Sequence, residues 1–212
     1  MVRTPRLSEP DRETVTGNPL RSVRRVFGTR WGPVVLALAF VEGVVVLGVL
    51  VHLAPAVQAL GSTAAVAGAV AASFGVGALG WSRLVRLRVG RTSPAGLAAT
   101  GGGFLVAAWA APAVTVNIAT ITAAGFLLGG SWAFLHSTLQ SWATEVVAGE
   151  RATSVALFAA MLFLGSAAGT AAAGPLAEAG AYGPIFQAAV LGSIPLALVA
   201  VFARARYARR AG

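Results

Sequence analysis

Six long apolar runs follow one another along this chain, and each is long enough to cross a lipid bilayer. The hydrocarbon core of a bilayer is about 30 Å thick, which a helix crosses with roughly 20 residues. Glycine and proline inside the runs are no objection, because membrane helices tolerate both. We predict an all-α, integral membrane bundle of six transmembrane helices at about 33–54, 62–82, 94–111, 113–137, 152–174 and 184–203.

The composition agrees with a chain surrounded by lipid. Only 11% of its residues are charged, whereas a soluble domain carries about 25%. The net charge of +9 does not indicate nucleic acid, because the arginines alternate with apolar runs instead of forming one patch. The sequence has no cysteine, and its two histidines, His52 and His136, are far apart, so we expect no metal site.

Other classes of membrane protein would need signatures that this sequence lacks. It has no Gly-x-x-x-x-Gly-Lys-Ser/Thr segment to hold a nucleotide phosphate and no Gly-x-Ser-Gly loop of a rhomboid-type protease. It also has no Asn-Pro-Ala pair of an aquaporin and no repeated acidic signature of a mitochondrial carrier. We therefore expect neither an enzyme nor a bound cofactor.

The distribution of arginines predicts how the bundle sits in the membrane. They gather before the first apolar run, between the second and third, and after the sixth. The first and third connections are uncharged, and the fifth carries only Glu178. By the positive-inside rule both termini lie on the cytoplasmic side of a cell (inner) membrane. The clustered arginines are Arg21, Arg24, Arg25, Arg30, Arg83, Arg86, Arg88, Arg91, Arg204, Arg206, Arg209 and Arg210.

Three parts follow from this arrangement: a polar and basic cytoplasmic segment at 1–30, the bundle at 31–204 and a basic cytoplasmic tail at 205–212. Residues 1–19 are polar and rich in proline and acids, which is typical of disorder. Residues 20–31 combine apolar residues at helical spacing with arginines. This pattern fits an amphipathic helix lying on the membrane and equally a solvated basic linker.

Small residues at fixed spacing indicate where helices approach closely. Lipid gives helices little hydrophobic reason to associate, so close backbone contact through small residues is needed. The fourth run contains Gly125-x-x-x-Gly129 and the fifth contains Gly165-x-x-x-Gly169. These glycines are predicted helix-packing sites, without indicating a function.

Two stretches carry a resemblance to a known family. "LALAFVEGVVVLGVLVHLAPAVQALG" resembles the seventh helix of a bacterial drug-efflux member of the major facilitator superfamily and the loop after it. "LHSTLQSWATEVVAGERATSVALFAAMLFLGSAAGTAAAGPLAEAG" is similar to that family's tenth helix, short cytoplasmic loop and eleventh helix. The resemblance implies the C-terminal six-helix half of such a transporter, built as two inverted three-helix repeats.

The chain departs from the family pattern in two ways. The basic motif between the eighth and ninth helices of the family usually holds an aspartate, and "GWSRLVRLRVGR" has Leu87 at that place. The motif residues present here are Arg83, Arg86, Arg88, Gly90 and Arg91. The family's first six helices are also absent from the sequence, so the substrate path between two halves would require a second copy of this chain or a separate N-terminal half.

Glu42 and Asn117 are the candidates for a proton-coupling or substrate-cavity site. Glu42 is the one acid well inside a predicted span, about nine residues or roughly 13 Å deep, and an ionisable group at such depth suggests function. It could carry protons for an exporter, or it could be a protonated structural residue bonded to a neighbouring helix. Asn117, in the predicted fourth span, could face the cavity or bond across helices.

A polar series at the end of the fourth run suggests a cytoplasmic gate. His136, Gln140 and Thr144 repeat every four residues and would share one helix face. With Glu145 and Arg151 they could hold the helix ends together on the cytoplasmic side and release them when the cavity opens. The alternative interpretation is an ordinary interfacial helix end with belt aromatics.

The function expected from this resemblance is transport of a small molecule by a half-size transporter, through proton-coupled efflux. The expected partners are the lipid bilayer, the substrate and either a second copy or a six-helix N-terminal half, with no nucleic acid. The alternative is a half from a truncated or split gene that does not transport independently, or an accessory subunit of a membrane transporter.

Overall fold

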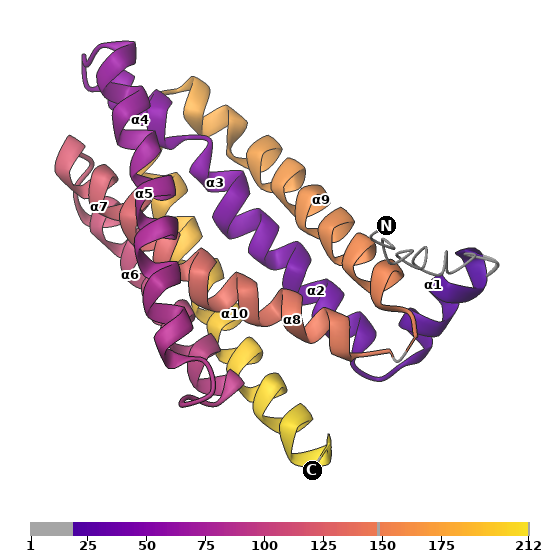
Figure 1. Ribbon diagram of the computed structural model, residues 1–212. Helices are drawn as coiled ribbons and strands as arrows, with labels where there is room; N and C mark the ends of the chain where they lie inside the picture. The colour runs from indigo at the N-terminus through magenta and orange to yellow at the C-terminus, as the bar shows by residue number, and fades with distance from the viewer. Residues whose placement is uncertain (1–18, 148, 212) are drawn as a thin grey trace, which may run out of the picture.

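Six helical segments long and apolar enough to cross a membrane make up the bundle (Figure 1). The computed structural model describes residues 19–147 and 149–211, so the disorder predicted for 1–19 lies outside it except for the last residue. The described residues contain no strand, and the fold is the expected all-α membrane bundle. Its helices are α1 (Pro19–Gly28), α2 (Gly32–Glu42), η1 (Gly43–Leu47), α3 (Gly48–Leu50), α4 (Leu53–Ala59), α5 (Ala64–Arg88), α6 (Pro94–Val114), α7 (Ile118–Ser131), η2 (Trp132–His136), α8 (Ser137–Glu145), α9 (Arg151–Glu178) and α10 (Tyr182–Ala211).

The first and fourth spans are composite, whereas the others are single helices. The first span runs from α2 through the π-helical turn η1 and α3 into α4, and the fourth runs from α7 through the π-helical turn η2 into α8. Each of these two segments is 28 residues long. The first and fourth spans are each the first helix of a three-helix unit, so the two irregular spans occupy equivalent places.

The contacts between helices also relate the first three spans to the last three. The first span packs on the fifth (α2 with α9), and the fourth packs on the second (α7 with α5). The third span contacts the fourth (α6 with α7), and the sixth contacts the first (α10 with α2). Alternating chain direction makes the two units run in opposite senses, so this pattern is that of an inverted three-helix repeat.

Several helices extend beyond the apolar runs of the sequence. Helix α5 continues through its arginines to Arg88, α8 continues to Glu145, and α10 continues to Ala211, which includes most of the predicted tail at 205–212. Arginine and glutamate are good helix formers, so polarity at the membrane surface does not end a helix. The turn before the fourth span also differs from expectation: α6 continues through Pro112 to Val114, and α7 begins only at Ile118.

Glycines bring the backbones of neighbouring helices into contact. A Cβ at Gly165 would overlap the carbonyl oxygen of Phe40, and one at Gly43 would overlap that of Leu162. On the other side of the bundle a Cβ at Gly125 would meet the Ser73 side chain, and one at Gly129 would meet the backbone of α5. Gly169 lies against Val44 in the same way. The seams between α9 and the first span and between α7 and α5 thus exist only because these residues lack side chains.

Helix α1 is joined to the start of α9 at one end of the bundle (Figure 1). Arg25 Nη1 lies 2.9 Å from Glu150 Oε1, and Val26 is buried. The helix ends at Gly28, before the expected residue 31, because the Thr29 side chain accepts from Gly32 N–H and donates to the Val26 carbonyl. This turn leads the chain directly into α2.

Replacing Gly165 by alanine should destabilise the bundle, because the added methyl group has no space beside the Phe40 carbonyl. We expect the free energy of unfolding to fall by about 1–3 kcal/mol, the usual effect of overpacking. The matched control is Gly68→Ala in α5, where a Cβ meets nothing within 4 Å and alanine favours the helix. Denaturant unfolding in detergent micelles measures both; equal stabilities for the two variants would contradict the close seam.

The contact between α1 and α9 should weaken in acid. A side-chain hydrogen bond from Ser22 and, after it, the Arg25 guanidinium hold the pKa of Glu150 below its ordinary value. A carboxyl with a lowered folded-state pKa adds stability above its unfolded pKa of about 4.3 and loses this contribution as the pH falls through the lower folded value. The distribution of distances between spin labels on α1 and α9 should therefore broaden as the pH falls below about 4.3.

Glu150→Gln should give the same broadening at neutral pH, because the amide cannot form the ion pair. Glu178→Gln is the control, since Glu178 is exposed at the end of α9. Distances in Glu150→Gln that stay as narrow as in the native chain would show that another contact holds α1.

Candidate functional site

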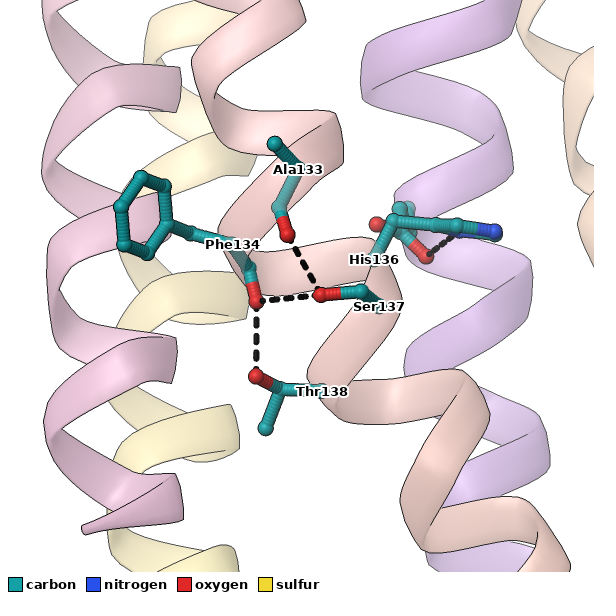
Figure 2. Close-up of polar contacts among 6 residues, drawn as sticks. Ala133, Phe134, His136, Ser137 and Thr138 are labelled. Atoms are coloured by element: carbon teal, nitrogen blue, oxygen red, sulfur yellow. Dashed lines mark hydrogen bonds and ion pairs between the residues drawn. The ribbon is translucent and has the colours of Figure 1, made fainter. Parts of the chain in front are cut away.

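A carboxylate and an imidazole from different spans meet inside the bundle. Glu42, the last residue of α2, has Oε2 3.2 Å from Nδ1 of His136, the last residue of η2. The Glu42 side chain is 1% exposed and that of His136 is 9% exposed. Figure 2 shows His136 pointing from its own helix toward the neighbouring one. The contact joins the first span to the fourth.

Each member of the pair lies beside a π-helical turn. η1 begins directly after Glu42, and the Gly48 N–H donates to the Gly43 carbonyl; in η2 the Ser137 N–H donates to the Trp132 carbonyl. Both bonds connect residues five apart, so each helix is locally wider than an α-helix. Such turns occur frequently at functional sites. Here they adjust the direction of the two side chains that meet.

Hydroxyl groups support the irregular turn that carries His136 (Figure 2). The Phe134 carbonyl accepts from Thr138 Oγ1 at 2.7 Å and from Ser137 Oγ at 3.3 Å. Ser137 also donates to the carbonyl of Ala133. Because a carbonyl without a partner is costly in lipid, these hydroxyls stabilise the turn by adding donors to its carbonyls.

Aromatic rings enclose the imidazole. The Trp132 ring is stacked on His136 with centroids 3.6 Å apart and planes 9° apart, and the Phe158 ring lies 5.6 Å away. The second carboxylate oxygen of Glu42, Oε1, is buried and has no hydrogen-bond partner among the described residues. The pair is therefore an acid and a base in direct contact beside aromatic rings.

The pair lies well below the surface of the bundle. Glu42 follows Gly32, the start of its span, by ten residues, and His136 precedes Glu145, the end of its span, by nine. At 1.5 Å per residue both are about 14–15 Å from the same end of the bundle. The sequence analysis placed His136 at a helix end because it stopped the fourth span at 137. The structure corrects this, since α8 continues to Glu145.

The remaining gate candidates do not gather around His136. Gln140 and Glu145 are exposed, as is Arg151 at the start of α9. Thr144 donates to the Ser141 carbonyl in its own helix. The five residues thus form no single polar cluster.

Glu145 instead contacts a residue that the sequence analysis counted only as a basic marker. Arg204 Nη2 in α10 lies 2.8 Å from Glu145 Oε2, and Arg204 is buried. Its guanidinium lies 5.5 Å from the Trp142 ring and 5.1 Å from the Tyr207 ring. This contact ties the end of the fourth span to the sixth. The available signal was the position of Arg204 close to the end of the last apolar run.

Asn117 caps a helix and does not lie inside a span. Its side chain accepts from the Thr120 N–H at 2.9 Å, and the Thr120 side chain accepts from the Asn117 N–H at 3.2 Å. This reciprocal capping box starts α7. The Asn117 side chain, for which the sequence left open a place in the cavity or a bond across helices, is therefore used to begin a helix.

The basic motif covers the exposed last turns of α5 and the turn that leads to α6. Gly90 has a φ of +83°, a conformation that glycine adopts without strain, and the N–H groups of Arg91 and Thr92 both donate to the Arg88 carbonyl. The side chains of all four arginines are exposed: Arg83, Arg86, Arg88 and Arg91. The turn presents positive charge at one end of the bundle.

The buried pair consists of a carboxyl and an imidazole, two groups whose chemistry is proton binding and metal coordination. In the described part of the chain no three His, Cys, Asp or Glu side chains gather as metal ligands. An acid and an imidazole in contact can share, accept and pass a proton. Both residues were candidates from the sequence, but their contact could not be predicted, because they are 94 positions apart and were assigned to different sites.

Comparison with known proteins identifies the family. The family model described as Major Facilitator Superfamily matches residues 1–170 of the 212. No curated protein and no solved structure was found to match the chain. The matched region contains the first four spans and most of the fifth, including both residues of the buried pair. With six spanning helices and this match, the chain is a multi-pass membrane protein that belongs to the Major Facilitator Superfamily of membrane transporters.

Proposed function

We propose that the chain transports a small molecule across the membrane in exchange for protons, and that Glu42 and His136 form the proton site. The observation that carries this proposal is their buried contact at 3.2 Å. An ionisable residue inside a membrane is costly and suggests function by default. Two such residues in contact, within a family of transporters, supply the titratable group that proton coupling requires.

The arrangement suggests how proton binding would change the structure. With one proton shared, the pair is neutral, either as Glu⁻ with His⁺ or as two uncharged groups. A second proton gives a neutral carboxyl beside a charged imidazolium and removes the attraction between the two. The first and fourth spans could then separate, and loss of one proton would join them again.

The π-helical turns are suited to such a movement. Both start or end at the pair, and a wider turn can return to α-helical geometry by shifting one residue's hydrogen bonds. Trp132, stacked on His136, would follow the imidazole. Small changes at the pair would thus be passed to the halves of both spans beyond the turns.

We further propose that transport requires a partner, either a second copy or a separate six-helix N-terminal half. Transporters of this family place the substrate path between two six-helix units, and this chain supplies six spans. The α5 and α9 helices are the least buried of the spans. Gly68 and Gly75 lie on α5 with open space around them, which would allow close approach of another helix. The proposed direction of transport is efflux, because the chain resembles drug-efflux members of the family.

The arginine clusters would place both termini in the cytoplasm. Fusing a reporter active only in the cytoplasm after Arg91, and one active only outside it after Val116, should give activity at both sites. Exchanging the two reporters is the control and should abolish both signals. Activity of the external reporter after Arg91 would reverse the proposed orientation.

Glu42→Gln should stop proton-driven transport while preserving the fold. The amide keeps the size and hydrogen bonding of the carboxyl but cannot titrate. Movement of a lipophilic fluorescent dye under an imposed pH gradient should fall to the level of empty vesicles, whereas exchange of dye at equal pH should persist. The assay uses proteoliposomes containing the chain alone or co-purified with a partner half.

Glu178→Gln makes the same chemical change at an exposed helix end and should transport normally. Undiminished gradient-driven transport in Glu42→Gln would leave Glu42 a structural residue. Absence of any dye movement in the native chain, alone and with its partner half, would favour an accessory role instead.

A further inference from the structure

A basic hollow lies at the end of the bundle, outside the proposed proton site. It has a volume of about 340 Å³ and is lined by Arg30, Trp31, Arg206 and Arg209. Arg30 and Trp31 directly precede α2, and the other two belong to the last turns of α10. The hollow is therefore formed where the first span begins and the sixth span ends.

No acidic side chain among residues 19–147 and 149–211 compensates the charge in this hollow. None of the four described residues that line it is acidic. The two nearby glutamates are engaged elsewhere, Glu145 with Arg204 and Glu150 with Arg25. Among the described residues, none of the three lining arginines contacts a carboxylate. Three guanidinium groups around one space repel one another, and an anion between them would relieve this repulsion.

The site has an ordered aromatic wall. The Arg30 guanidinium lies 5.5 Å from the centre of the Trp31 ring. Trp31 in turn contacts Trp142 at 5.7 Å and Tyr207 at 5.9 Å between ring centroids. These contacts hold Trp31 and direct Arg30, so part of the site is formed before any ligand binds. Guanidinium groups recognise phosphate through paired hydrogen bonds.

An apolar surface leads into the hollow along α10. Val199, Phe202, Arg206 and Arg209 are three, four and three residues apart, which places them on one helix face. Val199 is 50% exposed and Phe202 is 64% exposed. In a bilayer this face would lie against acyl chains below the arginines. A ligand that combines a phosphate with a hydrocarbon chain fits both parts.

We propose that this hollow binds the phosphate-bearing headgroup of an anionic phospholipid, with an acyl chain along Val199 and Phe202. Basic pockets between membrane helices on the cytoplasmic side are suited to such headgroups. Trp31 directly precedes the first span, and tryptophan is frequent at the boundary between membrane and water. The site would fix the ends of the first and sixth spans to each other through a lipid. It does not depend on the proposed proton exchange.

The test compares two lipids on the purified chain in detergent. Native mass spectrometry measures binding of phosphatidylglycerol and of phosphatidylcholine with the same acyl chains, and we expect preference for the anionic lipid. Arg206→Gln/Arg209→Gln should reduce phosphatidylglycerol affinity about 30-fold, from the usual contribution of an arginine near an anionic surface.

The matched control is Arg83→Gln/Arg86→Gln on α5. These arginines are also exposed, three residues apart and near the end of their helix, and the variant loses the same charge. Its affinity should change by only a few-fold. An equal loss in both variants would show general surface attraction and overturn the site.

The lipid itself is tested against a free anion. Phe202→Gln should weaken phosphatidylglycerol binding, and inorganic phosphate should not displace the lipid from the native chain. Displacement by inorganic phosphate at equal phosphate concentration would overturn the lipid assignment, as would a Phe202→Gln variant that binds phosphatidylglycerol with native affinity.

Discussion

The backbone contact between the first span and α9 positions the rest of the bundle. Lipid provides little hydrophobic drive for helix association, so packing depends on how closely backbones can approach. Gly43 and Gly165 remove the side chains that would keep these helices apart, opposite the Leu162 and Phe40 carbonyls. Glu42 lies between Phe40 and Gly43 in sequence, so the same seam that joins the helices fixes the depth and direction of the buried carboxylate.

The π-helical turns explain how two distant residues meet at one depth. Glu42 and His136 are on spans that run in opposite directions, and each lies about 14–15 Å from the same end of the bundle. A π-helical turn beside each residue changes the rotation of the helix beyond it. The turns occupy equivalent spans of the two inverted units, so the proposed proton site would be built on a feature that both repeats share.

Sequence patterns were sufficient to predict the six spans, but they were insufficient to predict the contact between Glu42 and His136. Six apolar runs and a family resemblance gave the all-α membrane fold, because hydrophobic length is a strong constraint in a bilayer. The fourth span was predicted to end at 137, where polar residues become frequent, yet Leu139, Gln140, Ala143 and Glu145 are good helix formers and α8 continues to Glu145. Nothing in the local sequence marks a π-helical turn, so the proximity of residues 94 positions apart could not be predicted. The role of Asn117 was missed for a different reason. It caps α7, which begins at Ile118, whereas the predicted span began at 113.

Among the described residues, charged contacts between helices are found toward one end of the bundle, whereas close glycine packing occurs toward both ends. Three of the four described glutamates join segments toward the basic end: Glu42 with His136, Glu145 with Arg204 and Glu150 with Arg25. Toward the other end the described residues form no ion pair, and close packing of Gly48 against Gly169 joins the first and fifth spans. Charged contacts respond to protons and ions, whereas steric packing of glycine does not. Under the proposed proton exchange, a change in protonation would weaken contacts toward the basic end and leave those at the other end unchanged, which is the asymmetry that opening toward one side of a membrane requires.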